Sequence, residues 1–149
     1  MNGLINISEA TSIALHSCAW LATSDSEYSS VKKISAELGF SANHTAKVAQ
    51  ELVRAGILLS ERGPSGGLKL AKLPSTISIM DLCAATGCFP TEKGCLLKSR
   101  ICSGNRCALG KLLSDENKRL MTIFKQTTLA DIVLSLKKDP ALGEMKGDK

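Results

Sequence analysis

Two helical patterns, residues 31–38 and 42–55, are separated by a linker of only three residues, Gly39-Phe40-Ser41. Ser30 can cap the first helix, and Gly39 can end it in a left-handed turn. Ser41 can cap the second helix, and Gly56 can end it. Two short helices joined by a three-residue turn that contains glycine are typical of a helix-turn-helix. This spacing therefore predicts that the centre of the chain folds as that motif.

A β-hairpin is predicted directly after the second helix. Residues 57–59 are apolar, residues 61–67 read ERGPSGG, and the alternating segment LKLAK follows. Apolar segments on either side of a glycine-rich turn are typical of a hairpin. Arg62 would lie at its tip, where Gly66 and its neighbours let backbone N–H groups approach phosphate oxygens. A helix-turn-helix followed by a hairpin is a winged helix.

The second predicted helix has a polar stripe opposite its apolar side. Asn43, Lys47, Gln50 and Arg54 follow one another at steps of three and four residues. Asn and Gln side chains can pair with adenine, and Lys and Arg can reach guanine or phosphate. A solvated polar face of an ordinary amphipathic helix remains the alternative interpretation of this stripe.

The charge of the chain is concentrated in this region. Residues 30–72 contain seven Lys and Arg and three Glu, although the formal net charge of all 149 residues is only +5. A basic patch on a small domain indicates a polyanionic partner, or else a mildly basic solvated surface. No apolar run is long enough for a membrane span, and the N-terminus lacks the pattern of a secretory signal. We therefore expect a cytoplasmic protein that does not bind membranes.

The second half of the chain contains a cysteine-rich segment. Residues 87–110 lack helical periodicity and hold Cys95, Cys102 and Cys107 close to Lys98, Arg100 and Arg106. Their spacing lacks the close pairs that zinc sites and common ferredoxins use. An iron–sulfur cluster, zinc and metal-free thiol or disulfide chemistry all remain open, and the cluster is favoured. Cys83 and Cys18 lie on apolar helix faces and are expected in the core.

Two amphipathic helices are predicted beyond this segment, over residues 111–126 and from Thr127 or Thr128 onward. They carry more apolar surface than a small winged helix can cover, so we expect a homodimer. The predicted fold class is mainly α with a small β-hairpin, namely a winged helix-turn-helix plus a long C-terminal dimerisation helix. The predicted division is a DNA-binding domain over 1–75, a sensor loop with dimerisation helices over 76–138 and a flexible tail over 139–149.

From about Leu4 to Lys138 the chain resembles the bacterial winged-helix regulators that include the iron–sulfur cluster regulator IscR and the nitric-oxide-sensing repressor NsrR. The resemblance rests on the segments SANHTAKVAQELVRAGIL, ERGPSGGLKLAK, TISIMDLCAAT and TTLADIV, together with the three-cysteine loop. It implies a homodimer on a pseudo-palindromic, double-stranded operator. By position, the implied DNA contacts are Ser41, Asn43, His44, Lys47, Arg62 and Gly66.

The resemblance also implies that Cys95, Cys102 and Cys107 hold an iron–sulfur cluster that controls operator binding. Gly110 stands where the 2Fe–2S members have a histidine, so a 4Fe–4S cluster is favoured over 2Fe–2S. The fourth ligand is open among Glu9, Ser12, Cys88 and Cys18. Ala46 replaces an acidic residue that is frequent in the recognition helix of the family, which leaves the operator sequence undefined.

These features predict a transcriptional repressor that senses iron–sulfur status, redox state or nitric oxide. Its rivals are a winged-helix repressor with a metal-free thiol switch, a structural zinc module for protein interaction and a small iron–sulfur electron carrier. The only histidines are His16 and His44, and no nucleophile stands beside a base in the sequence. We therefore expect no enzymatic activity.

Overall fold

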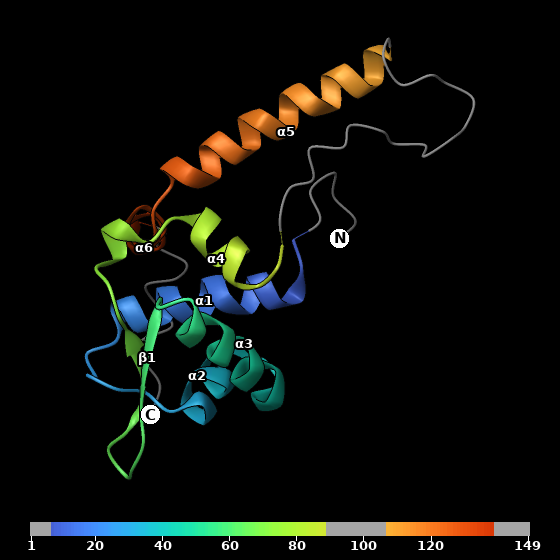
Figure 1. The fold of residues 1–149 in the computed structure, drawn as a ribbon. Coiled ribbons are helices and arrows are strands. Elements are labelled where there is room, and N and C mark those ends of the chain that lie inside the picture. Colours follow the sequence, from blue (N-terminus) through green and yellow to red (C-terminus); the bar gives the residue numbers. More distant parts are fainter. Residues whose placement is uncertain (1–6, 89–106, 139–149) are drawn as a thin grey trace.

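The computed structural model describes residues 7–88 and 107–138 (Figure 1). This part of the chain is mainly helical with one two-stranded antiparallel sheet, which confirms the predicted fold class. Its elements are α1 (Glu9–Thr23), α2 (Val31–Leu38), α3 (Ala42–Arg54), β1 (Leu58–Glu61), β2 (Gly67–Leu70), the 3-10 helix η1 (Pro74–Thr76), α4 (Ile79–Ala85), α5 (Ala108–Gln126) and α6 (Leu129–Lys138).

Helices α2 and α3 form the predicted helix-turn-helix. The Ser30 hydroxyl accepts a hydrogen bond from the Lys33 N–H at 3.1 Å and so caps α2. Gly39 ends α2 in the left-handed region with φ of 70°, a conformation that glycine adopts without steric cost. The chain can therefore reverse into α3 within three residues, as the sequence predicts.

Strands β1 and β2 form the predicted wing, with Leu58 opposite Leu70 and Glu61 opposite Gly67. The loop between α1 and α2 adds one residue to this sheet. The Ser29 N–H donates to the Leu68 carbonyl at 3.0 Å, and the Leu68 N–H donates to the Ser29 carbonyl at 2.8 Å. The wing is thereby held against the segment that leads into α2.

One hydrophobic core joins the helices and the wing. Its fully buried side chains come from α1, α2, α3, β1, α4 and α6, and examples are Ile13, Ile34, Leu52, Leu58, Leu82 and Leu129. Cys18 and Cys83 lie in the interior with exposed fractions of 0% and 1%, which confirms that both are core residues. The predicted domain boundary near residue 75 stays a prediction.

Helix α5 begins three residues earlier than the sequence pattern predicts, at Ala108. Cys107 is its N-cap residue, and its Sγ accepts a hydrogen bond from the Gly110 N–H at 3.4 Å. No residue of α5 is buried. Figure 1 shows α5 reaching away from the other helices, so that only its C-terminal end lies close to α4 and α6.

Candidate nucleic-acid interface

The two sides of α3 have the division that the sequence predicts. Thr45, Val48, Ala49 and Leu52 are buried against the core. The opposite side carries exposed amide and cationic side chains, which we call the recognition stripe: Asn43, Lys47, Gln50 and Arg54. Amide and cationic groups on one exposed face of a helix can reach base edges and phosphates in a major groove.

The N-terminus of α3 differs from those of α1, α2 and α4, where Ser8, Ser30 and Ser78 accept backbone hydrogen bonds. The Ser41 side chain makes no capping hydrogen bond, and its carbonyl accepts from the Thr45 hydroxyl at 2.9 Å. Ser41 is itself exposed. The first N–H groups of α3 therefore have no serine cap and are available to an outside acceptor such as a phosphate oxygen.

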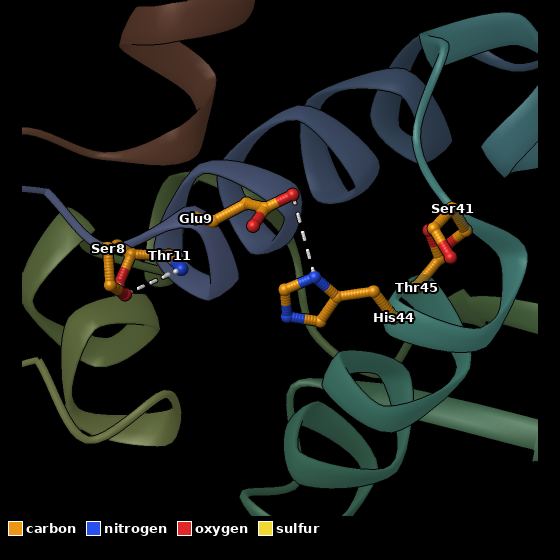
Figure 2. A network of polar contacts seen from close by, with 6 residues as sticks. All are labelled: Ser8, Glu9, Thr11, Ser41, His44 and Thr45. Atoms are coloured by element: carbon orange, nitrogen blue, oxygen red, sulfur yellow. Dashed lines mark hydrogen bonds and ion pairs between the residues drawn. The ribbon is translucent and has the colours of Figure 1, made fainter.

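His44 borders the recognition stripe but faces α1. Its Nδ1 lies 3.6 Å from a carboxylate oxygen of Glu9, the first residue of α1. Figure 2 shows the imidazole between the first turns of the two helices, with Thr45 on its own helix and Ser41 directly before that helix. The His44 side chain is 35% exposed, so part of the ring can still reach a ligand.

The wing carries Arg62 at its tip, where the side chain is exposed. Gly66 lies close to the opposite end of the turn, since a Cβ placed there would be 2.3 Å from the Glu61 carbonyl oxygen. Gly66 also donates its N–H to the Gly63 carbonyl at 3.1 Å. Its role at the tip is therefore first of all to allow a tight turn that presents Arg62.

Lys69 on β2 is engaged within the protein rather than free for DNA. Its Nζ lies 3.1 Å from a Glu27 carboxylate oxygen and 4.3 Å from the centre of the Tyr28 ring. Hydrogen bonding to Tyr28 and to Glu27 raises the pKa of Lys69. The exposed cationic groups of the interface are thus Lys47 and Arg54 on α3 and Arg62 on the wing, and none of the three forms an ion pair within residues 7–88 and 107–138.

The cysteines fall into two groups by environment. Desolvation by burial raises the pKa of Cys18 to about 12, and burial and the neighbouring Cys88 raise the pKa of Cys83. Cys88 and Cys107 are free thiols at intermediate exposure, on either side of residues 89–106. Cys95 and Cys102 lie outside the described residues, and within those residues no three His, Cys, Asp or Glu side chains group as a metal site.

Two of these contacts were not predicted from the sequence. Glu9 and His44 are 35 positions apart, and Glu27 and Lys69 are 42 positions apart. The sequence indicates Glu9 only as a possible cluster ligand and His44 only as a DNA contact, because periodicity within one helix does not show which residues of two helices meet. Within residues 7–88 and 107–138, no helix is both long and apolar enough to cross a membrane.

Comparison with known proteins identifies the family. The sequence profile of the Rrf2 family, described as iron-dependent transcriptional regulators, matches residues 7–135. The transcriptional regulator NsrR of Bacillus licheniformis is 32% identical over 139 residues, which cover 88% of this chain and 94% of the relative. These relatives are regulators of transcription and not enzymes.

Solved structures share the fold. CymR, the global cysteine regulator of B. subtilis, superposes with a TM-score of 0.74 at 20% identity, covering 89% of this chain and 98% of CymR. IscR of T. potens superposes with a TM-score of 0.71 at 20% identity, covering 98% and 94%. Together with the family match, the recognition stripe and the wing, these similarities confirm the expected resemblance, and the chain belongs to the Rrf2 family of transcriptional regulators.

Proposed function

We propose that the protein is a homodimeric repressor that binds a pseudo-palindromic operator and is controlled by an iron–sulfur cluster. The observation that carries the DNA-binding part is the recognition stripe on α3, exposed beside a wing with Arg62 at its tip. In this proposal α3 enters the major groove and the wing reaches the adjacent backbone or minor groove. Ser41, Asn43, His44, Lys47, Arg62 and Gly66 are the proposed contact positions.

The charges of this surface support phosphate binding. Lys47, Arg54 and Arg62 are exposed cations, and the α3 N-terminus adds backbone N–H groups. Affinity for any DNA would therefore fall steeply with salt, because each neutralised phosphate releases counterions. Sequence discrimination would come from the amide and cationic side chains that reach base edges.

The homodimer is supported by the uncovered apolar side of α5. Leu112 is 57% exposed and Ile123 is 47% exposed, and they are eleven residues apart, which is about three helical turns and places them on one face. A second copy of α5 packed on this face would remove both side chains from water. The two-fold symmetry of such a dimer would also provide two α3 helices for the two half-sites of one operator.

The described thiols fit the proposed cluster in part. Cys107 lies at the N-terminus of α5, where a backbone N–H points at its sulfur. Its thiol is free and of intermediate exposure, and it directly follows residues 89–106, which contain Cys95 and Cys102. We propose Cys95, Cys102 and Cys107 as the three cluster ligands. A 4Fe–4S cluster is preferred over 2Fe–2S, and when bound it would supply reactivity toward oxidants and nitric oxide.

The candidates for a fourth ligand differ in access. Cys18 is a poor candidate because it is 0% exposed and its pKa is raised to about 12. The Ser12 hydroxyl already has a partner within α1, since it lies 3.4 Å from His16 Nδ1. Glu9 is 72% exposed, and Cys88 directly precedes residues 89–106. Cys88 is therefore the candidate that needs the least rearrangement, because the Glu9 carboxylate already lies 3.6 Å from His44 Nδ1.

The test is anaerobic purification of the full chain, with an absorption spectrum and counts of iron and acid-labile sulfide per chain. The same sample then selects duplexes from a random pool. A coloured protein with about four irons per chain that enriches a palindromic sequence supports the proposal, and about two irons would favour the 2Fe–2S form. A colourless protein that still selects an operator would support the metal-free thiol switch. One zinc per chain without selection of DNA would support the zinc interaction module.

A further inference from the structure

The contact between Glu9 and His44 joins the start of α1 to the first turn of the recognition helix. The two side chains come from helices that are adjacent in the fold but far apart in sequence, and their nearest polar atoms are 3.6 Å apart. At this separation the contact is electrostatic rather than a hydrogen bond. Figure 2 shows the His44 imidazole pointing toward α1 and not along α3.

His44 occupies a position from which a side chain can read DNA. It is the third residue of α3, next to Asn43 and three residues before Lys47, so it borders the recognition stripe. The N-terminal residues of a recognition helix are the ones that contact base edges. The 35% exposure of the side chain leaves part of the imidazole free to meet such an edge.

The direction of the ring decides what His44 can recognise. A ring that is held in one orientation presents one fixed edge to the groove, and the donors and acceptors of that edge decide which base it can pair with. An acceptor in the major groove can pair with the exocyclic amine of adenine or cytosine, whereas guanine and thymine present acceptors there. Without the carboxylate, the imidazole can change both its rotamer and its tautomer.

We propose that Glu9 is a positioning residue for operator recognition, which orients the His44 imidazole so that it discriminates one base pair in each half-site. This inference rests on the proposed DNA-binding function and adds the specificity of one of its positions. Glu9 itself need not touch a base. Glu9 also has a general effect on DNA affinity, because an exposed carboxylate beside α3 repels phosphates of every sequence equally.

The test is a double-mutant cycle on anaerobically purified full-length chains: wild type, Glu9→Gln, His44→Ala and the double variant. Dissociation constants are measured at one salt concentration for a duplex that the wild type selects from a random pool. The same constants are measured for every single-base variant of that duplex and for a mixed-sequence duplex. Glu37→Gln on α2 is the matched control, because Glu37 is exposed and loses the same charge away from His44.

Both single variants should lower discrimination at the same base pair of each half-site by about fivefold or more, which is the lower end of the scale for one lost base contact. In the His44→Ala background, Glu9→Gln should cause no further loss of discrimination at that base pair. Glu37→Gln should change affinity for all duplexes by one common factor. Iron is counted in each preparation, and if Glu9→Gln lowers it, the cycle is repeated on cluster-free samples of all four proteins.

Two results would overturn the inference while leaving the proposed function intact. In one, Glu9→Gln changes affinity for every duplex by the same factor, as a purely electrostatic role requires. In the other, Glu9→Gln and His44→Ala alter different base pairs. Failure of the proposed function would look different, because the wild-type protein itself would bind selected and mixed-sequence duplexes equally.

Discussion

The hydroxyl oxygens of Thr11 and Thr86 lie 2.8 Å apart and join the first turn of α1 to the residue that follows α4. Thr11 is fully buried, and its hydroxyl also lies 2.8 Å from that of Ser8. The Thr86 hydroxyl donates to the Leu82 carbonyl at 3.0 Å. This pair therefore connects the helix that contacts α3 to the segment that directly precedes residues 89–106.

Replacement of Thr11 by Val should lower the free energy of unfolding by about 1–2 kcal/mol, because the Thr86 hydroxyl loses a partner in a part-buried site. Urea unfolding at a fixed protein concentration measures the change. Thr122→Val on α5 is the control, since its hydroxyl donates to Lys118 on an exposed helix surface. That variant should stay within about 0.5 kcal/mol of the wild type, and equal losses in the two variants would argue against a special role for the Thr11–Thr86 pair.

Gly67 lies where the wing passes the loop before α2. Its φ is 153°, and a Cβ there would be 2.6 Å from the carbonyl carbon and oxygen of Ser29. Gly67→Ala should therefore displace the wing and lower the free energy of unfolding by about 2 kcal/mol or more. Urea unfolding and DNA affinity report the two effects. Ser65→Ala at the exposed tip is the control, and a Gly67→Ala protein as stable as this control would contradict the close approach.

The helix-turn-helix and wing were predictable because their signals are local. Ser30 and Gly39 mark the ends of α2 through their own backbone preferences, and the structure confirms both. The hairpin follows from alternation and a glycine-rich turn, and the structure confirms an antiparallel pair of strands there. Signals of this kind need no knowledge of the rest of the fold.

The parts that were missed depend on packing between distant segments. Nothing in the sequence around Ser29 shows that it pairs with Leu68, and nothing around Glu9 shows that it meets His44. The start of α5 was also missed, because Gly110 in the first turn weakens the helical pattern while the Cys107 sulfur acts as the cap. The roles of the individual DNA contacts remain predictions.

Acid should destabilise α6 through Asp131. The Asp131 carboxylate accepts hydrogen bonds from the Thr128 hydroxyl at 2.7 Å and from the Thr128 N–H at 2.8 Å. These hydrogen bonds, the one from the hydroxyl first, lower the pKa of Asp131 below the usual 3.8. A carboxyl whose pKa is lowered by folding stabilises the folded state above its unfolded pKa, and this stabilisation is lost as the pH falls through the folded value. Asp131→Asn should therefore lower the melting temperature at neutral pH.

The difference in melting temperature between Asp131→Asn and the wild type should shrink as the pH is lowered from about 5 through the folded pKa of Asp131, which lies below 3.8, because the carboxyl of the wild type then loses its charge. Thermal unfolding followed by circular dichroism across this range measures it. Asp25→Asn, in the exposed loop after α1, is the control for the loss of one charge. A constant difference at all pH values would show that the capping hydrogen bonds act independently of the charge.

Lys47→Ala should separate base reading from phosphate binding. If Lys47 reads a base, affinity for the selected duplex falls about tenfold, while affinity for mixed-sequence DNA falls only about two- to threefold at the same salt. Titrations with fluorescent duplexes at several salt concentrations measure both. Lys125→Ala on α5, which also removes one exposed cation, is the control. Equal losses for both duplexes would make Lys47 a phosphate contact instead.

The exposed apolar side of α5 should decide whether the protein is a dimer. Leu112→Glu would place a carboxylate in the proposed interface, where its desolvation opposes association, so the dimer dissociation constant should rise by about a hundredfold or more. Sedimentation velocity over a range of concentrations measures the change. Lys118→Glu, at an exposed polar position of the same helix, should leave the dimer intact. If Leu112→Glu remains dimeric, another surface holds the two copies together. If it becomes monomeric, it should also lose most of its affinity for a palindromic duplex, because one α3 helix can occupy only one half-site.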